Sequence, residues 1–283
     1  MSKEQITVIG AGTMGAGIAG QAAVCGMRTA LFDVNENGLE KGLKSIKASY
    51  SKGQTRGKLT TAEVDQALAN LNTSTNLANA VEGATIIIEA VPENMALKQS
   101  LFKDIEGLVD TDVILASNTS SLSISSIAQV LEHPQRMVGL HFFNPVAVMK
   151  LLEIVRGSQT DEVTLNRVVT FAHNMRKEHI LVKDSPGFAT SRLGIALGNE
   201  AMRMFEEGVA SAEDIDKAMS LGYRHPIGPL ALSDLVGLDV RLAITKHLHT
   251  ELGTDTFKPA AILETLVAAG HLGRKTGKGF YTY

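Results

Sequence analysis

The stretch Ile6-Thr-Val-Ile9-Gly10-Ala-Gly12-Thr13-Met14-Gly15 decides the first part of the fold. Its apolar start predicts a buried strand, and the residues after Gly15 are typical of a helix. In such a turn the first glycine permits the tight bend, the second lets the backbone approach a pyrophosphate, and the third lets the helix pack on the sheet. The helix N-terminus also offers N–H groups to phosphates. The expected dinucleotide contacts are Gly10, Gly12, Thr13, Met14 and Gly15.

Asp33 indicates which dinucleotide is bound. It follows the next predicted strand, Arg28–Phe32, where an acidic side chain can bind the ribose hydroxyls of NAD. A carboxylate at that place repels the 2′-phosphate of NADP. The alternative is a glycine-rich turn with an aspartate that merely caps a strand, and the order strand, turn, helix, strand favours the cofactor site. The sequence therefore predicts NAD.

Short β-branched segments alternate with longer amphipathic ones in the first part of the chain, which is typical of βαβ units and a parallel sheet. The Lys-rich stretch 37–68 predicts a helical excursion between the second and third strands. The predicted strands are 6–9, 28–32, 85–91, 113–116, 136–143, 151–155 and 180–182. The predicted helices of this part are 12–25, 95–108, 124–131 and 164–175.

The strand pattern stops at Asp184-Ser-Pro-Gly187, and a change from α/β to all-α marked by proline and glycine indicates a domain boundary. We therefore predict an α/β protein, with a Rossmann-type NAD-binding domain and mostly parallel sheet in residues 1–184. An all-α domain is predicted in residues 185–283. Its predicted helices are 191–207, 212–220, 229–252 and 258–269.

Composition excludes several classes of protein. The 283 residues carry a formal net charge of −3 without a block of like charge, so neither a nucleic-acid partner nor a polybasic membrane anchor is expected. The one cysteine, Cys25, cannot form an internal disulfide or a cysteine metal site, and no metal is expected. Without a secretory signal or a membrane-length apolar run, the sequence predicts a soluble, cytoplasmic protein.

His141 and Glu153 are the best candidates for chemistry. His141 interrupts an apolar run, and an imidazole titrates near neutrality, as proton transfer from an alcohol requires. A core histidine bonded to a carbonyl is the alternative. However, Glu153 interrupts the next apolar run, and a carboxylate there needs a partner. If the chain folds back near Ala147, the two face each other across strands, and Glu153 orients the imidazole.

Ser117 and Asn118 end another predicted strand, 113–116. Ligands of open α/β sheets bind beyond the carboxyl ends of strands, so both side chains are candidates to donate hydrogen bonds to a reacting oxygen. For Ser117 a purely structural role is an equal alternative. The serines that follow, 120–126, are interpreted as helix capping.

These motifs together resemble the L-3-hydroxyacyl-CoA dehydrogenase family, and within it the bacterial 3-hydroxybutyryl-CoA dehydrogenases. The matching blocks span nearly the whole chain, and the blocks that begin at Ala116 and at His141 are more specific than the glycine turn. They are Gly10-Ala-Gly-Thr-Met-Gly15, Ala116-Ser-Asn-Thr-Ser-Ser-Leu122, His141-Phe-Phe-Asn-Pro145, Val148-Met-Lys-Leu-Leu-Glu153, Pro186-Gly-Phe188, His225-Pro-Ile-Gly-Pro229 and 272–281.

The resemblance implies NAD-dependent interconversion of a (3S)-3-hydroxyacyl-CoA and a 3-oxoacyl-CoA. It also implies that the helical domain, residues 185–283, serves substrate closure and forms a homodimer. It makes His141 the general base, Glu153 its orienting partner and Ser117 a hydrogen-bond donor to the substrate oxygen. The cofactor contacts that it implies, beside the glycine turn, are Asp33, Glu93, Lys98, Asn118 and Asn144. The implied contacts to the CoA moiety are Ser49, Lys52 and Arg56.

Ser191 is a departure from the family pattern. The family usually has asparagine in Pro-Gly-Phe-x-x-Asn-Arg, beside the reacting carbon, and here Ser191 takes that place. A serine can still donate a hydrogen bond but lacks the paired donor and acceptor of an amide. A second interpretation is therefore an NAD-dependent dehydrogenase of a free 3-hydroxy acid such as a sugar acid. A non-catalytic NAD-binding sensor is a third, although a buried base and carboxylate argue against it.

Overall fold

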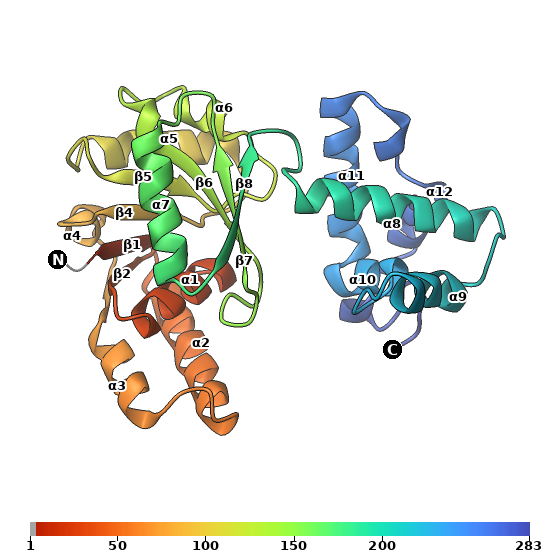
Figure 1. Ribbon diagram of the computed structural model, residues 1–283, viewed down its shortest axis with the longest axis horizontal. Helices are drawn as coiled ribbons and strands as arrows, with labels where there is room; N and C mark the ends of the chain where they lie inside the picture. The colour runs from red at the N-terminus through yellow and green to blue at the C-terminus, as the bar shows by residue number, and fades with distance from the viewer. Residues whose placement is uncertain (1–3) are drawn as a thin grey trace. The chain divides into compact units, whose positions relative to one another are not determined.

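An eight-stranded sheet organises residues 4–184 of the computed structural model, which describes residues 4–283 (Figure 1). Its strand order is β3-β2-β1-β4-β5-β6-β7-β8. Neighbouring strands run parallel except β6 and β7, which are antiparallel. The strands are β1 (Gln5–Ile9), β2 (Arg28–Phe32), β3 (Leu71–Ser74), β4 (Ile86–Glu89), β5 (Ile114–Ser117), β6 (Met137–Phe142), β7 (Leu151–Arg156) and β8 (Glu178–Lys183).

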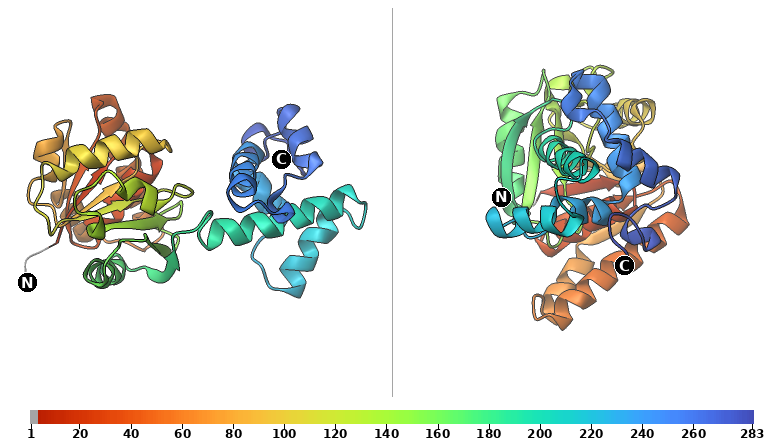
Figure 2. Two further views of the ribbon diagram at one scale, coloured as in Figure 1. Left: turned by 90° about the horizontal axis from the view of Figure 1, so that it is seen from above. Right: turned by 90° about the vertical axis from the view of Figure 1, so that its right-hand side faces the viewer.

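Helices cover both faces of this sheet, which explains why β4, β5 and β6 are buried along their whole length (Figure 2). On one face α1 and α7 share a core cluster with apolar side chains of the central strands. The opposite face carries α5 and α6. The helices of this unit are α1 (Thr13–Val24), α2 (Glu36–Thr55), α3 (Thr61–Ala69), α4 (Leu77–Val81), α5 (Met95–Glu106), α6 (Ile124–Ala128) and α7 (Glu162–Asn174).

The region between β2 and β4 differs from the sequence prediction. The expected excursion over 37–68 is two helices, α2 and α3, because Gly57 adopts a φ of 65° and a capping box of Thr60 with Glu63 starts a new helix. The short strand β3 follows and was not predicted. Its four residues are partly or fully exposed and mostly polar, so they lack the apolar run that identifies a buried strand.

Residues 185–283 form a second compact unit, and the chain divides between Asp184 and Ser185. The predicted helix 229–252 is wrong in one respect, because it breaks at Gly237, whose φ of 105° lies outside the helical region. Among residues 4–283 no helix is long and apolar enough to span a membrane. The helices are α8 (Thr190–Glu206), α9 (Ala212–Lys217), α10 (Pro229–Val236), α11 (Leu238–Leu252) and α12 (Ala261–Ala268), with a π-helical turn over Ala218–Gly222.

Two buried aspartates hold the helical unit together. Asp216 accepts hydrogen bonds from the first N–H groups of α10, those of Leu230 and Ala231, at 2.8 Å each. Asp234 accepts from the backbone N–H groups of Phe280 and Tyr281 at 3.0 Å each. Each carboxylate therefore satisfies donors that would otherwise be buried without partners.

Candidate active site

The glycine turn is built to receive a phosphate group. Gly10 has a φ of 101°, and a Cβ on Gly15 would lie 1.8 Å from the carbonyl oxygen of Gly10, so any side chain there is excluded. Around Gly12 a Cβ would meet nothing within 4 Å, and no side chain caps the start of α1. The start of α1 therefore has room beside Gly12 for the pyrophosphate of a dinucleotide, which the N–H groups of a helix N-terminus bind.

Asp33 lies beside this turn, directly after β2. Its Oδ2 accepts from the Ala11 N–H at 2.8 Å, and its Oδ1 accepts from the Asn35 N–H at 3.1 Å. Asp33 is half-buried, so the carboxylate remains within reach of a ligand on the turn. This arrangement fits NAD.

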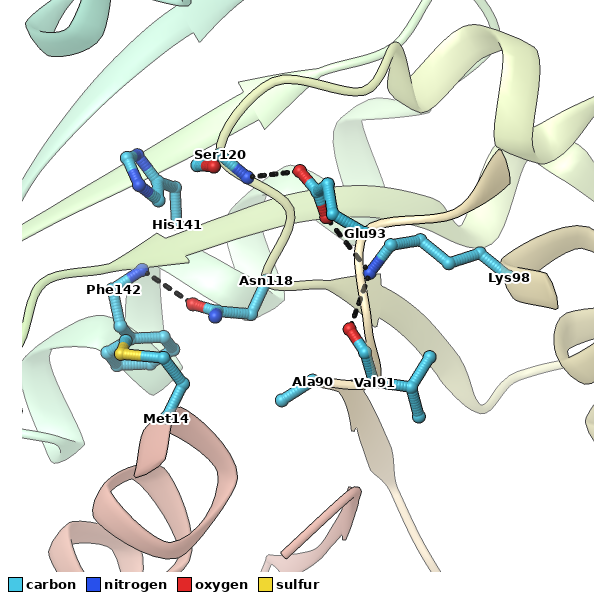
Figure 3. Close-up of a pocket in the computed structure, with 9 residues that line it drawn as sticks. All are labelled: Met14, Ala90, Val91, Glu93, Lys98, Asn118, Ser120, His141 and Phe142. Carbon is cyan, nitrogen blue, oxygen red and sulfur yellow. Dashed lines mark hydrogen bonds and ion pairs between the residues drawn. The ribbon is translucent and has the colours of Figure 1, made fainter. Parts of the chain in front are cut away.

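A pocket of about 280 Å³ opens at the carboxyl ends of β4, β5 and β6 (Figure 3). Parallel strands bring these ends to one edge of the sheet, which is where open α/β sheets bind ligands. Met14 of the glycine turn also reaches the pocket, so the cofactor cradle and the pocket are continuous. The lining residues are Met14, Ala90, Val91, Glu93, Lys98, Asn118, Ser120, His141 and Phe142.

His141 and Glu153 face each other across β6 and β7. The antiparallel register pairs the two residues directly, as expected from the sequence, and Nδ1 of His141 lies 2.6 Å from Oε2 of Glu153. Glu153 is fully buried, while His141 retains 7% exposure and lines the pocket. A carboxylate oxygen accepts hydrogen bonds, so this contact favours the tautomer of His141 that carries its proton on Nδ1.

Glu89, at the end of β4, organises the floor of the site, and the sequence analysis gave it no role. Its Oε1 accepts from Nζ of Lys98 at 2.5 Å, and its Oε2 accepts from the hydroxyl of Ser117 at 2.6 Å. Glu89 is fully buried and Lys98 is 1% exposed. Lys98 therefore neutralises a buried carboxylate as well as lining the pocket. A glutamate in an apolar run such as Ile86-Ile-Ile-Glu89 is the signal that could have revealed this pair.

Glu93 fixes the loop after β5. Its Oε1 accepts from the Thr119 hydroxyl at 2.6 Å and from the backbone N–H groups of Ser120 and Ser121 at 3.1 and 3.2 Å. Burial acts to raise the pKa of Glu93, but the Thr119 hydroxyl and the Lys98 charge outweigh it and lower that pKa. Glu93 is thus an anion that holds this loop and contacts Lys98 at 3.3 Å.

Two serines, Ser117 at the end of β5 and Ser120 in the loop that follows, differ in position from what the sequence suggested. Ser117, expected to bond the substrate oxygen, is fully buried and donates to Glu89, so it does not line the pocket. Ser120, which the sequence analysis interpreted as helix capping, lines the pocket with His141, and its hydroxyl points toward the imidazole side (Figure 3). Ser120 reaches the pocket because Glu93 holds the loop after β5. Its carboxylate binds loop residues that lie 26 to 28 positions later in the sequence.

The remaining residues that the sequence analysis assigned to the cofactor or the substrate lie in different parts of the fold. Asn118 lines the pocket, and its Oδ1 accepts from the Phe142 N–H at 2.9 Å, whereas Asn144 is exposed in the loop after β6. Ser191 is half-buried in the first turn of α8. Among residues 4–283 no cluster of three metal-ligating side chains occurs. Three expected CoA contacts are exposed on or next to α2, namely Ser49, Lys52 and Arg56.

A Rossmann-type sheet, a dinucleotide cradle and a carboxylate-held histidine beside it define an NAD-dependent oxidoreductase. Residues 5–185 match the family described as 3-hydroxyacyl-CoA dehydrogenase, NAD binding domain, and residues 187–283 match 3-hydroxyacyl-CoA dehydrogenase, C-terminal domain. The chain therefore belongs to the 3-hydroxyacyl-CoA dehydrogenase family. The family, fold class and cofactor predicted from the sequence are confirmed.

Known relatives resemble the chain over its full length. The probable 3-hydroxybutyryl-CoA dehydrogenase of Bacillus subtilis is 46% identical over 283 residues, 100% of this chain and 98% of that protein. The 3-hydroxybutyryl-CoA dehydrogenase of Clostridioides difficile is 42% identical over 99% of both chains. A crystal structure of (S)-3-hydroxybutyryl-CoA dehydrogenase from Ralstonia eutropha matches with a TM-score of 0.96 and 43% identity, covering 100% of this chain and 99% of that one.

Proposed function

We propose that the chain interconverts (3S)-3-hydroxyacyl-CoA and 3-oxoacyl-CoA thioesters, 3-hydroxybutyryl-CoA among them. The observation that carries this proposal is the His141–Glu153 pair, at 2.6 Å, in a pocket continuous with the glycine turn. A dehydrogenase of a secondary alcohol needs a base beside its cofactor, and this pair meets that need. The names of the Bacillus subtilis and Ralstonia eutropha relatives supply the substrate class.

His141 acts as the proton carrier. In the direction of oxidation its Nε2 accepts the proton of the 3-hydroxyl while hydride leaves C3, and in reduction it returns that proton to the 3-oxo oxygen. Bound NAD supplies the acceptor or donor of the hydride. Glu153 stabilises the imidazolium that forms and keeps the ring in one orientation, as the carboxylate of a catalytic triad does.

Ser120 replaces Ser117 as the hydrogen-bond donor to the substrate oxygen, because it lines the pocket with His141. Asn118, whose Oδ1 is held by the Phe142 N–H, presents its amide nitrogen to the cofactor side of the pocket (Figure 3). Asp33 binds the ribose hydroxyls, and Asn144 lies beside the nicotinamide. Lys98 and Glu93 act mainly by holding the floor and the loop of the site.

The remaining parts of the proposal concern CoA and assembly. Ser49 and Lys52, three residues apart on α2, share one face of that helix, and Arg56 caps its C-terminal end, so all three are assigned to the CoA moiety. Residues 185–283 form a homodimer, and Ser191 takes part in substrate binding. The exposed apolar side chains of that unit, Leu193 and Leu221 at 71% and 80% exposure among them, support an interface. The single cysteine is in keeping with a cytoplasmic location.

Steady-state oxidation of NADH with acetoacetyl-CoA tests the proposed function, with NADPH and free acetoacetate run in parallel. We expect turnover that requires NADH and the thioester. Turnover of the free acid in place of the thioester would favour the 3-hydroxy acid dehydrogenase interpretation. NADH binding without turnover of any substrate would favour the sensor.

A further inference from the structure

Lys177, in the turn between α7 and β8, is a buried cation whose ammonium group binds backbone carbonyls. It is 6% exposed, and its Nζ donates to the carbonyl oxygen of Val146 and to that of Met149, the latter at 2.7 Å. The ion pairs found among residues 4–283 do not include Lys177. Burial lowers the pKa of this ammonium group. A charge taken out of water needs its acceptors held in place, so Lys177 and the two carbonyl groups fix one another.

Both carbonyl groups belong to the β6–β7 loop, residues 143–150, which joins the only two neighbouring strands of the sheet that run antiparallel. The N–H groups of Val148 and Met149 both donate to the carbonyl oxygen of Pro145, at 2.9 and 3.0 Å, so this part of the loop is a tight turn. Lys177 binds this turn from positions 28 and 31 residues later in the sequence. The ammonium is therefore a cross-link between two distant turns of the chain.

The backbone of Lys177 is itself fixed by the end of α7. Its N–H donates to the carbonyl oxygen of Ala172 at 2.9 Å, and Arg176 before it has a φ of 56°, in the left-handed region. This pattern is a Schellman motif, in which glycine is usual at the position of Arg176. Nε2 of Gln21, on α1, also donates to the carbonyl oxygen of Met175 at 3.2 Å. The turn that carries Lys177 is thus attached to both α7 and α1.

Helix α1 contacts the β6–β7 loop directly as well. A Cβ on Gly17 would lie 2.9 Å from Cγ2 and 3.2 Å from Cβ of Val146, whose side chain is buried. Glycine inside a helix is unfavourable relative to alanine, so this close approach is kept at a cost in helix stability. Val146 is therefore held at its carbonyl by Lys177 and at its side chain by α1.

The β6–β7 loop carries two side chains that bear on the proposed chemistry. Phe143 packs against His141, with ring centroids 4.5 Å apart and ring planes inclined at 50°. Asn144, the next residue, is exposed and is the proposed neighbour of the nicotinamide. Because a misplacement of about 1 Å caused by a remote mutation can lower a rate about 100-fold, the position of this loop affects the reaction.

We propose that Lys177 is a positioning residue of the active site: its ammonium fixes the β6–β7 loop, which places Phe143 against the imidazole and Asn144 beside the nicotinamide. The inference rests on the proposed function, because it takes hydride transfer beside His141 as given. Lys177 lies outside the lining of the pocket, so it acts through the loop. A lysine that only stabilised the fold would leave kcat of the folded enzyme unchanged.

Lys177→Met separates the two roles, because it keeps the apolar stem and removes the ammonium. Kinetics with acetoacetyl-CoA and saturating NADH are measured at a temperature where circular dichroism and urea unfolding show that the variant is folded. We expect kcat to fall about 10- to 100-fold while KM for acetoacetyl-CoA changes by less than about 3-fold. Arg176→Met, which removes the neighbouring exposed cation, is the matched control and should keep both wild-type values.

Two further variants decide the matter if Lys177→Met does not fold. Lys177→Gln retains an N–H donor on a shorter side chain, and Gly17→Ala crowds Val146 from α1. Both should lower kcat more than they change KM, because each displaces the same loop.

Three outcomes would contradict these expectations. A wild-type kcat in folded Lys177→Met or Lys177→Gln, with acetoacetyl-CoA turned over by the wild type, would overturn this inference and leave the proposed function intact. An equal loss of kcat in Arg176→Met would overturn it too, because any charge removed from this turn would then have the same effect. No turnover by the wild type would overturn the proposed function, and this inference with it.

Discussion

The hydroxyl of Ser117 donates to Oε2 of Glu89 at 2.6 Å, and both side chains are fully buried under the floor of the pocket. The same carboxylate binds Nζ of Lys98 at 2.5 Å through its other oxygen. Glu89 thus joins β4, β5 and the start of α5 in one charged network without solvent. A serine in such a network contributes to stability, and the proposed substrate contact is Ser120, in the loop after β5.

We therefore expect Ser120→Ala to lower the catalytic activity and Ser117→Ala to lower the stability of the fold. Ser120→Ala removes a hydrogen bond to the reacting oxygen, so we expect kcat/KM for acetoacetyl-CoA to fall about 10-fold or more with unchanged thermal stability. Ser117→Ala leaves a buried carboxylate oxygen without its donor and should lower stability by about 1–3 kcal/mol. Steady-state kinetics and urea unfolding of both variants check this. The assignment fails if Ser117→Ala shows the larger kinetic loss at equal stability.

His141 and Glu153 should behave as one unit. His141→Ala removes the base, and we expect kcat to fall by a factor of about 10² to 10⁴ while NADH affinity stays nearly constant. Glu153→Gln should also lower kcat strongly, because the ring loses its orientation and its imidazolium loses a counter-charge. The double variant should be little slower than His141→Ala, since residues of one unit are not additive. If the double variant instead lost the product of the two single losses in kcat, Glu153 would act independently of the imidazole.

Asp33→Asn should weaken NADH binding and raise the relative preference for NADPH. The charge that binds the ribose hydroxyls and repels a 2′-phosphate is lost, so we expect the NADH Kd to rise about 10-fold or more. Titration of both nucleotides by calorimetry measures this. Asp65→Asn, which neutralises an exposed carboxylate on α3, is the matched control and should change neither value. An unchanged ratio of the two Kd values in Asp33→Asn would remove Asp33 from cofactor selection.

Local patterns predicted the strands that are continuous apolar runs, such as β4, β5 and β6, and the longer amphipathic helices of residues 4–184. The pairing of His141 with Glu153 was predictable because two apolar runs, each interrupted once, are joined by a short connection. The strand β3 was missed because Leu71–Ser74 is an edge strand, where burial does not impose an apolar run. The predicted helix 229–252 is interrupted at Gly237, which has a positive φ. The sequence did not reveal this interruption because the apolar pattern on both sides of Gly237 is helical.

The choice between Ser117 and Ser120 could not be made from spacing. Both follow the same predicted strand, and what separates them is a set of bonds from Glu93 and Glu89, residues that lie more than 20 positions earlier. Such contacts depend on how β4 and β5 are placed side by side, which no local pattern encodes.

Glu106 provides a test of stability against pH. Its carboxylate, at the end of α5, accepts from the backbone N–H groups of Glu132 and His133 at 2.8 and 3.0 Å and from Nη2 of Arg136 at 3.1 Å. Burial acts to raise the pKa of Glu106, but the two N–H groups and the Arg136 charge outweigh it and lower that pKa in the folded state. The charged form therefore stabilises the fold above the unfolded-state pKa, and this stabilisation is lost as pH falls through the folded-state value.

Glu106→Gln should accordingly reduce the free energy of unfolding by about 1–3 kcal/mol at neutral pH. The difference from the wild type should shrink as pH falls below the ordinary glutamate pKa of 4.5, because a protonated glutamate resembles glutamine in shape and charge. Urea unfolding of both proteins at about pH 7 and about pH 3.5 measures the two differences. Glu162→Gln, whose side chain is 70% exposed beside Arg156, is the control and should change stability by less than about 1 kcal/mol at either pH. A difference for Glu106→Gln that stays constant between the two pH values would mean that Glu106 stabilises the fold through packing, because a contribution from its charge must disappear on protonation.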